Sequence, residues 1–412
     1  MAASPRLAFG RALAAYMALV VAAVALVPYE FRWPARFELC WTLGLADLVT
    51  NVALFVPLGY LVGLSRGEPS GRVVLRALAA GALLSVAIEV TQWFVPGRYT
   101  QLSDVATNAA GAALGALLHG ALRRAGVSDP VERVFRLDLP LMTNLYLLLP
   151  ILWLDGLAAT GDPARLWLLA GPGLVGAGLA AEASALRRAE AGAPGQARLL
   201  AFVLGWFAVG TLPVAWRRPG LVGGLAVALA AVALAWHALA RRGAGRERRR
   251  ELPALRRAAP AFLAYLATIA LWRPPLAGTP FGALSFEARV AATFRFVEVL
   301  AAFTLLGYAI AEVRGRREEP ASRLGLLVAA TAAAGYGALL ALGGAFSTGA
   351  HAAEAAGVVA GALAGAAIYR LQRAMFAGPG AQGLAPSASS SARSPSSSNR
   401  KSEKGTLPFL QT

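Results

Sequence analysis

The chain has 412 residues, of which 57% are hydrophobic and only 15% are charged. This composition supplies too little polar surface for a water-soluble globule of that length, so a bilayer has to be the solvent. The formal net charge of +17 comes from arginines that stand in short clusters between apolar runs. That pattern is typical of membrane proteins and argues against a nucleic-acid-binding domain.

Apolar runs long enough to cross a bilayer occur about twelve times. Arginine-rich loops alternate with loops that lack them, which predicts that both termini are cytoplasmic in the cell (inner) membrane. The expected fold class is all-α, a polytopic transmembrane helix bundle with no soluble catalytic domain. In chain order the predicted spans are 10–27, 47–64, 77–95, 104–122, 141–158, 167–181, 199–215, 220–240, 259–277, 296–313, 324–345 and 352–369.

Short sequence elements recur at a nearly constant offset, which indicates a parallel internal repeat. Three pairs carry it: 55–60 with 303–308 at an offset of 248, 15–18 with 264–267 at 249, and Gly111 and Gly115 with Gly361 and Gly365 at 250. Under these offsets most polar residues of the first copy meet apolar ones in the second, which predicts a degenerate scaffold. We expect a four-helix unit over 1–124, a four-helix middle segment with an Arg-rich cytoplasmic linker over 125–257, the degenerate second unit over 258–376, and a disordered cytoplasmic tail over 377–412.

Six polar residues of the first unit fall at the same predicted side of the membrane. Ionisable groups inside a span cost roughly 2.5 to 3.5 kcal/mol at the helix centre, so they normally pair or face a cavity. Glu89 is the most informative of them, and Arg98 in the following loop is an available electrostatic partner. The helical spacing predicts an extracytoplasmic ligand-binding pocket formed by Asn51, Glu89, Gln92, Arg98, Asp104 and Asn108. Interhelical hydrogen bonding with a loop salt bridge is the structural alternative.

Small residues and a proline mark the predicted packing face of the same helices. Gly111 and Gly115 continue the stripe that Asp104 and Asn108 begin, while Pro57 and Gly59 lie on the second span. Glycine permits close approach of two helix backbones in a membrane. We expect these four residues, Pro57, Gly59, Gly111 and Gly115, to serve helix packing.

The sequence offers no metal site and no cofactor motif. Cys40 is the only cysteine, and the three histidines are widely separated along the chain. The only lysines are Lys401 and Lys404, so there is no phosphate-binding loop of the Gly-Lys type. We therefore expect neither a metal nor a cofactor.

The residues of the first unit resemble the VanZ-like family. The resemblance lies in Asn51, Phe55, Pro57 and Gly59, then Glu89 and Gln92, then Arg98, and finally Asp104, Asn108, Gly111 and Gly115 in that order. It covers residues 10–124, and 258–373 only as a degenerate copy. It implies a multi-pass cell-envelope protein, with a family-level association with glycopeptide resistance.

Three functions follow from these features. The first is an outward-facing pocket that engages a cell-wall precursor, a lipid headgroup or a glycopeptide, with Arg98 meeting an anion and Glu89 orienting Arg98 or an amine. The second is a membrane enzyme in which Glu89 acts as general base on a lipid-linked substrate and Asp104 is the partner acid. The third is a transporter or flippase, which a parallel repeat would allow. We expect the binding function rather than an enzyme.

Overall fold

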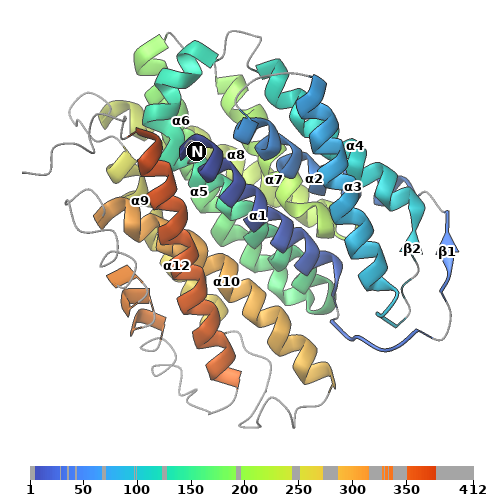
Figure 1. Ribbon diagram of the computed structural model, residues 1–412. Helices are drawn as coiled ribbons and strands as arrows, with labels where there is room; N and C mark the ends of the chain where they lie inside the picture. Colours follow the sequence, from blue (N-terminus) through green and yellow to red (C-terminus); the bar gives the residue numbers. More distant parts are fainter. Residues whose placement is uncertain are drawn as a thin grey trace, which may run out of the picture. The chain divides into compact units, whose positions relative to one another are not determined.

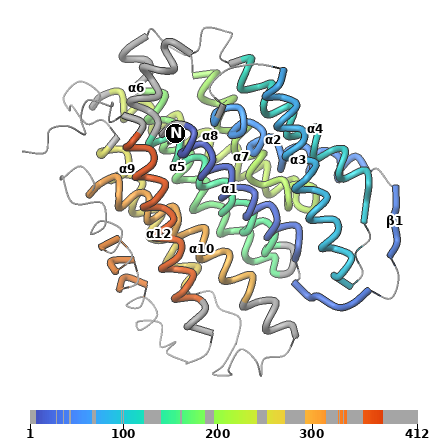
Figure 2. Tube along the Cα trace, in the orientation of Figure 1, coloured from blue at the N-terminus to red at the C-terminus, as the bar shows by residue number. Residues whose placement is uncertain are grey.

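Long helices make up nearly all of the described chain, because apolar, alanine- and leucine-rich segments must satisfy their backbone hydrogen bonds internally in a bilayer. Figures 1 and 2 show most of these helices running roughly along a common direction, with a short two-stranded ribbon beside α3 and α4. The elements are α1 (Pro5–Ala25), β1 (Leu39–Cys40), α2 (Leu45–Arg66), α3 (Gly71–Gln92), β2 (Thr100–Gln101), α4 (Leu102–Leu122), α5 (Ser128–Gly161), the 3₁₀ helix η2 (Pro163–Leu169), α6 (Ala170–Ala191), α7 (Gln196–Ala215), α8 (Pro219–Gly243), α9 (Glu251–Leu271), α10 (Phe286–Arg314) and α12 (Ala350–Phe376).

The computed structural model describes residues 5–27, 29–34, 37–41, 44–66, 71–96, 98, 100–122, 128–191, 196–243, 251–271, 286–314 and 350–376, together with 327–328, 330–332 and 334–336. The predicted tail over 377–412, most of the Arg-rich linker and much of the predicted span 324–345 lie outside the described residues.

The predicted all-α membrane fold is confirmed. Within the described ranges, nine helices are long and apolar enough to cross a membrane, and each coincides with a predicted span. The predicted spans at 104–122 and 259–277 also fall on helices, α4 and α9, which are not among those nine. The protein is therefore a multi-pass membrane protein.

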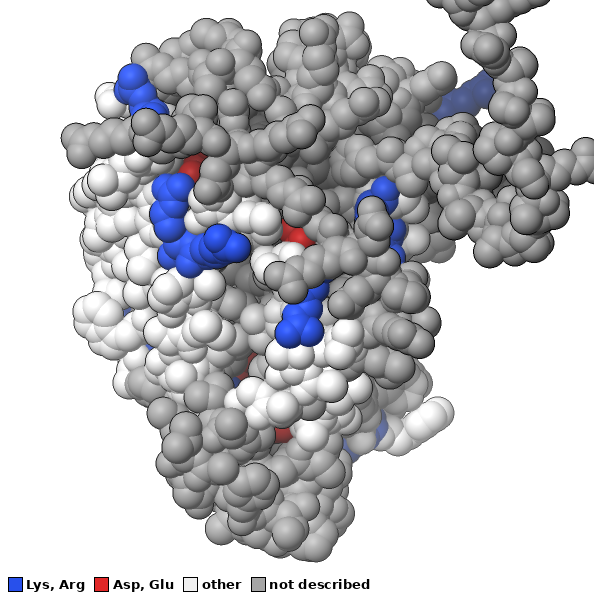
Figure 3. Space-filling view, turned by 90° about the vertical axis from the view of Figure 1, so that its left-hand side faces the viewer, with Lys and Arg blue, Asp and Glu red and all other residues white. Residues whose placement is uncertain are grey.

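The outer surface of the bundle is apolar, as lipid contact requires. On α3 the side chains of Leu75, Leu83 and Val86 are exposed, and Leu83 retains 71% of its accessible surface. Figure 3 shows one face on which the described surface is largely uncharged and only scattered arginines and a few acidic side chains are visible. Exposed leucine and valine on a helix face are stable in hydrocarbon, whereas in water they would promote association.

Helices α2 and α4 pack with their backbones in direct contact, and glycines make this possible. A Cβ on Gly59 would lie 1.8 Å from the carbonyl oxygen of Ala112, and one on Gly115 would lie 2.1 Å from that of Val56. Gly111 likewise faces the carbonyl oxygen of Val52, at 2.4 Å. The predicted packing glycines thus lie where the two helices approach closest, and Pro57 lies within the same stretch of α2.

Helices α10 and α12 repeat this contact atom for atom. A Cβ on Gly307 would meet the carbonyl oxygen of Ala362, one on Gly361 that of Leu300, and one on Gly365 that of Thr304. Each pair corresponds to its counterpart in α2 and α4 at the offsets of 248 and 250 seen in the sequence. This correspondence supports our proposal that the two helix pairs are copies of one unit.

Candidate functional site

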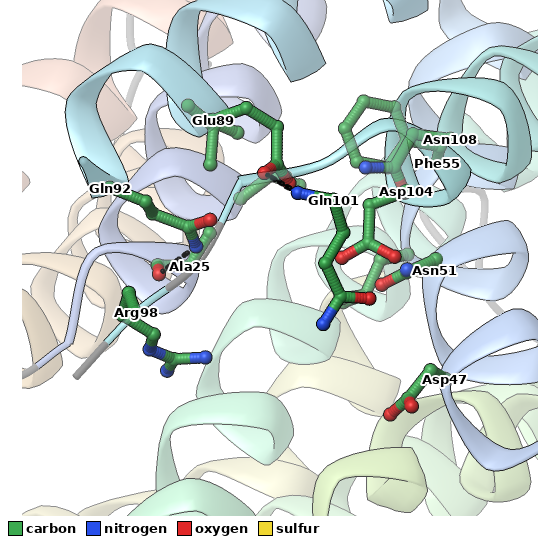
Figure 4. A pocket seen from close by; sticks show the side chains of 13 residues that line it. Ala25, Asp47, Asn51, Phe55, Glu89, Gln92, Arg98, Gln101, Asp104 and Asn108 are labelled. Atoms are coloured by element: carbon green, nitrogen blue, oxygen red, sulfur yellow. Dashed lines mark hydrogen bonds between the residues drawn. The ribbon is translucent and has the colours of Figure 1, made fainter. Parts of the chain in front are cut away.

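A polar cavity of about 220 Å³ lies among α1, α2, α3, α4 and the loop before α4. We call it the polar pocket. All six sequence-predicted residues, Asn51, Glu89, Gln92, Arg98, Asp104 and Asn108, line it, as Figure 4 shows. Its remaining lining residues are Val21, Ala25, Asp47, Leu54, Phe55, Ile88 and Gln101. The structure thus brings together the residues that the spacing predicted, whereas their binding role stays a prediction.

Glu89 is held in the last turn of α3 by the chain that enters α4. Its Oε2 atom accepts a hydrogen bond of 2.8 Å from the backbone N–H of Gln101, and its backbone carbonyl accepts one of 3.0 Å from the hydroxyl of Thr100. Strand β2, which contains both residues, pairs in parallel with β1. The Glu89 side chain is almost fully buried, at 4% exposure. A carboxylate that accepts from a backbone N–H is fixed in direction, so Glu89 presents its other oxygen to the pocket.

Two amides and two further carboxyl groups complete the side of the pocket formed by α2 and α4. The Asp104 carboxylate accepts a hydrogen bond from the Asn51 side chain, and Asp47 lies near enough to Asp104 to interact with it electrostatically. Asn108 donates a hydrogen bond of 2.8 Å to the Ser85 hydroxyl, while its own Oδ1 is buried without a hydrogen-bond partner. A buried acceptor without a donor is costly and marks a position where a ligand donor would be stabilised.

Arg98 lies apart from the carboxylates. Its exposed guanidinium donates a hydrogen bond of 3.3 Å to the backbone carbonyl of Val27, and among the described residues it forms no ion pair. Gln92 donates a bond of 2.9 Å to the carbonyl of Ala25. The expected Glu89 to Arg98 contact is therefore only a longer-range attraction, and Figure 4 shows Arg98 on one side of the pocket with Asp104 and Asp47 on the other.

The loop after α1 carries exposed aromatic side chains beside the pocket. Trp33 and Phe37 are 82% and 56% exposed, and each makes an edge-on contact with an aromatic residue that follows α3. Tyr29 has a positive φ of 62°, a strained conformation for this residue type, and its hydroxyl donates to the carbonyl of Ala23. Burial raises the pKa of Tyr29 to about 12, so the phenol remains a donor at neutral pH.

Sequence reasoning missed two polar lining residues. Asp47 lies one turn before Asn51 on the same face of α2, so its spacing could have placed it in the site. Gln101 could not have been found by helical spacing, because it contributes its backbone N–H from β2. Leu54 and Phe55 supply an apolar wall that no polar pattern reveals.

The pocket is rich in carboxyl groups. Within the described ranges no group of three or more histidine, cysteine, aspartate or glutamate side chains is arranged to hold an ion. Three carboxyl groups and one guanidinium line the pocket, so its charge is net acidic when all are ionised. This arrangement can hold a cationic hydrogen-bond donor.

The second unit is not as apolar as the sequence comparison predicted. Arg295 occupies the position that corresponds to Asp47 at the offset of 248, and Glu354 corresponds to Asp104 at 250. The two lie 3.6 Å apart, Nε to Oε1, in a buried ion pair. The sequence comparison matched Asp104 with Glu354 but did not include Asp47, so it did not register Arg295.

Residues 10–123 match the family model described as VanZ/LLP1. The VanZ-like resemblance is thereby confirmed for the part of the chain that contains α1 to α4 and the whole polar pocket. No curated protein and no solved structure matches the chain.

Proposed function

We propose that the polar pocket binds the amine-bearing headgroup of a cell-envelope lipid or lipid-linked cell-wall precursor at the outer face of the membrane. One observation carries this proposal: three carboxyl groups, an unpartnered amide oxygen and one guanidinium converge on a single small cavity. We treat the site as a binding site in the first instance, because its described lining residues include no serine, threonine, cysteine or histidine.

The charge balance of the pocket favours an ammonium group. Glu89, Asp104 and Asp47 attract a cation, and Asn108 Oδ1 accepts a hydrogen bond from it. An ammonium group is a compact cation with three donors, so it satisfies several acceptors at once. Arg98, which is exposed at the pocket and free of ion pairs with described residues, suits the phosphate of the same headgroup. In this proposal Arg98 binds the anionic part of the headgroup, and the carboxylates bind its amine.

The aromatic loop supports a headgroup over a soluble ligand. Tryptophan side chains in a membrane protein are enriched at the level of lipid headgroups. Trp33, Phe37 and Trp41 are exposed on the loop that joins α1 to α2, both of which line the pocket. A pocket at that depth meets headgroups by lateral diffusion.

Binding can be tested by thermal unfolding of the purified protein in detergent with added short-chain lipids. We expect phosphatidylethanolamine to raise Tm and phosphatidylglycerol, which lacks the amine, to leave it unchanged. Glu89→Gln and Asp104→Asn should each weaken phosphatidylethanolamine binding about tenfold or more, because a hydrogen bond to a charged group contributes about 1.5 to 3 kcal/mol.

Glu38→Gln is the matched control, because Glu38 is an exposed carboxylate on the same loop that does not line the pocket. This variant should bind like the wild type. Equal stabilisation by both lipids, or binding that survives Glu89→Gln and Asp104→Asn together, would rule out the amine pocket. A rise in Tm with a glycopeptide and with neither lipid would assign the pocket to that ligand instead.

The sidedness of the pocket is tested by labelling intact cells with a membrane-impermeant thiol reagent. Cys40 is replaced by serine, and a single cysteine is introduced in each of two variants. Arg98→Cys lies beside the pocket, and Arg241→Cys is an exposed position near the C-terminal end of α8. We expect reaction at position 98 only. Reaction at position 241 only would invert the topology and exclude a ligand of the cell wall.

A further inference from the structure

A second buried polar cluster lies where α5 and η2 meet α10 and α12, separate from the polar pocket. We call it the α5–α10 cluster. Glu298 forms two ion pairs. Its Oε1 lies 2.5 Å from Nη2 of Arg165, and its Oε2 lies 2.5 Å from Nη1 of Arg295. Arg295 also approaches Glu354 and donates to the backbone carbonyl of Ile269. The cluster consists of Asp155, Arg165, Arg295, Glu298 and Glu354.

The cluster contains three carboxyl groups and two guanidinium groups, so one carboxyl has no arginine of its own. Glu298 has both arginines, and Glu354 has Arg295 together with a 2.6 Å hydrogen bond from the Tyr336 hydroxyl. Among the described residues, the donor to Asp155 is the neutral hydroxyl of Tyr265, which lies 3.1 Å from Oδ1. The Oδ2 of Asp155 is buried and receives no N–H or O–H donor from the described residues, and the residue has no solvent exposure.

The contact between Asp155 and Glu298 requires a proton. The two carboxyl groups lie within hydrogen-bonding reach of each other. Two ionised carboxylates cannot form that bond, because neither carries a donor, whereas a protonated carboxyl has one O–H. Like charges that share a buried site hold a proton between them for the same reason. Burial of a lone ionised carboxylate in a membrane would be far more costly than its neutralisation.

We propose that the α5–α10 cluster is a proton-binding site, in which the proton resides on Asp155 and is donated to Glu298. The groups that face Asp155 are Tyr265 on α9, Glu298 on α10 and Arg165 on η2. Glu182 on α6, which also packs against α5, is engaged instead by Arg257 and Trp236. Both oxygens of Glu298 accept hydrogen bonds from arginines, so Glu298 is the acceptor of the pair and the proton is placed on Asp155.

The site joins the middle segment to the second unit, since Asp155 belongs to α5 and Glu298 to α10. The proton comes from and returns to solvent water, so no other reactant is needed. Loss of the proton would place two negative charges against each other across the α5–α10 interface and favour its separation. The cluster therefore makes contact between these two helices dependent on proton occupancy, independently of what the polar pocket binds.

The proposal is tested by infrared absorption of the full-length protein in lipid at neutral pH. We expect a protonated-carboxyl C=O band that shifts in deuterated water, because the proton exchanges, and that disappears in Asp155→Asn. Glu89→Gln, which alters the polar pocket, should retain the band. A band that persists in Asp155→Asn, or its absence from the wild type, overturns the proposal.

Thermal stability provides a second readout from the same variant. Asn has the size of a protonated Asp and no charge, so Asp155→Asn should fold with a Tm close to that of the wild type. At high pH the wild type should lose stability as Asp155 deprotonates, and Asp155→Asn should lose less. Failure of Asp155→Asn to fold at neutral pH would show that a negative charge is required there and would also overturn the proposal.

Discussion

Arg295→Met is expected to destabilise the protein by about 3 to 5 kcal/mol, the largest effect of any single charge removal in the described chain. Arg295 contacts Glu298 and Glu354 and donates to the Ile269 carbonyl, and it is only 5% exposed. Its loss leaves two carboxylates buried with fewer donors, and the cost of burying a charge is offset only while its partner is present. Thermal unfolding and the monodisperse fraction on size exclusion in mild detergent measure the effect.

Arg72→Met is the matched control for that substitution. Arg72 is exposed at the start of α3 and forms no ion pair with a described residue, so its replacement should change stability by no more than about 0.5 kcal/mol. If Arg295→Met and Arg72→Met had the same small effect, the buried contacts of Arg295 would not hold α10 and α12 together.

Gly59→Val should destabilise the first unit by about 3 kcal/mol or more, at the upper end of overpacking costs. The added Cβ would lie 1.8 Å from the Ala112 carbonyl oxygen, a backbone atom that cannot rotate away. Helices α2 and α4 would have to separate, and Gly111 and Gly115 would then lose their contacts as well. The measurements are Tm and yield of folded protein, with lipid binding by the polar pocket as a local readout.

Gly205→Val provides the control, because a Cβ at Gly205 in α7 would meet nothing within 4 Å. Gly307→Val tests the repeat, since its Cβ would lie 2.4 Å from the Ala362 carbonyl oxygen. We expect Gly307→Val to destabilise in the same direction as Gly59→Val and Gly205→Val to be tolerated. Tolerance of Gly59→Val would mean that α2 and α4 do not require close backbone contact.

The buried α5–α10 cluster favours the transporter alternative more than the sequence did. The sequence predicted that the second unit is a degenerate scaffold, which would give a transporter ionisable groups in one half only. Arg295, Glu298 and Asp155 form a buried ionisable network in the other half of the bundle. The proposed proton site in one half and the proposed ligand pocket in the other would together allow proton-coupled movement of a lipid, which proteoliposome assays with a pH gradient would detect.

The sequence by itself determined the membrane class, the helix positions and the six polar residues that line the pocket. It could do so because transmembrane helices need about twenty apolar residues each and because polar residues three or four apart share a helix face. Spacing along a helix and the alternation of the helix ends along the chain were sufficient to gather Asn51, Glu89 and Asp104 in one place.

Only the tertiary structure decided how charges are paired between helices distant in sequence. Glu298 contacts Arg165, which lies 133 residues earlier, and Asp155 meets Tyr265 across 110 residues. Gln101 reaches Glu89 through a backbone N–H, a group that every non-proline residue has. Local periodicity carries no information on which faces of α5, α9 and α10 meet, because that choice is made by side-chain packing across the whole bundle.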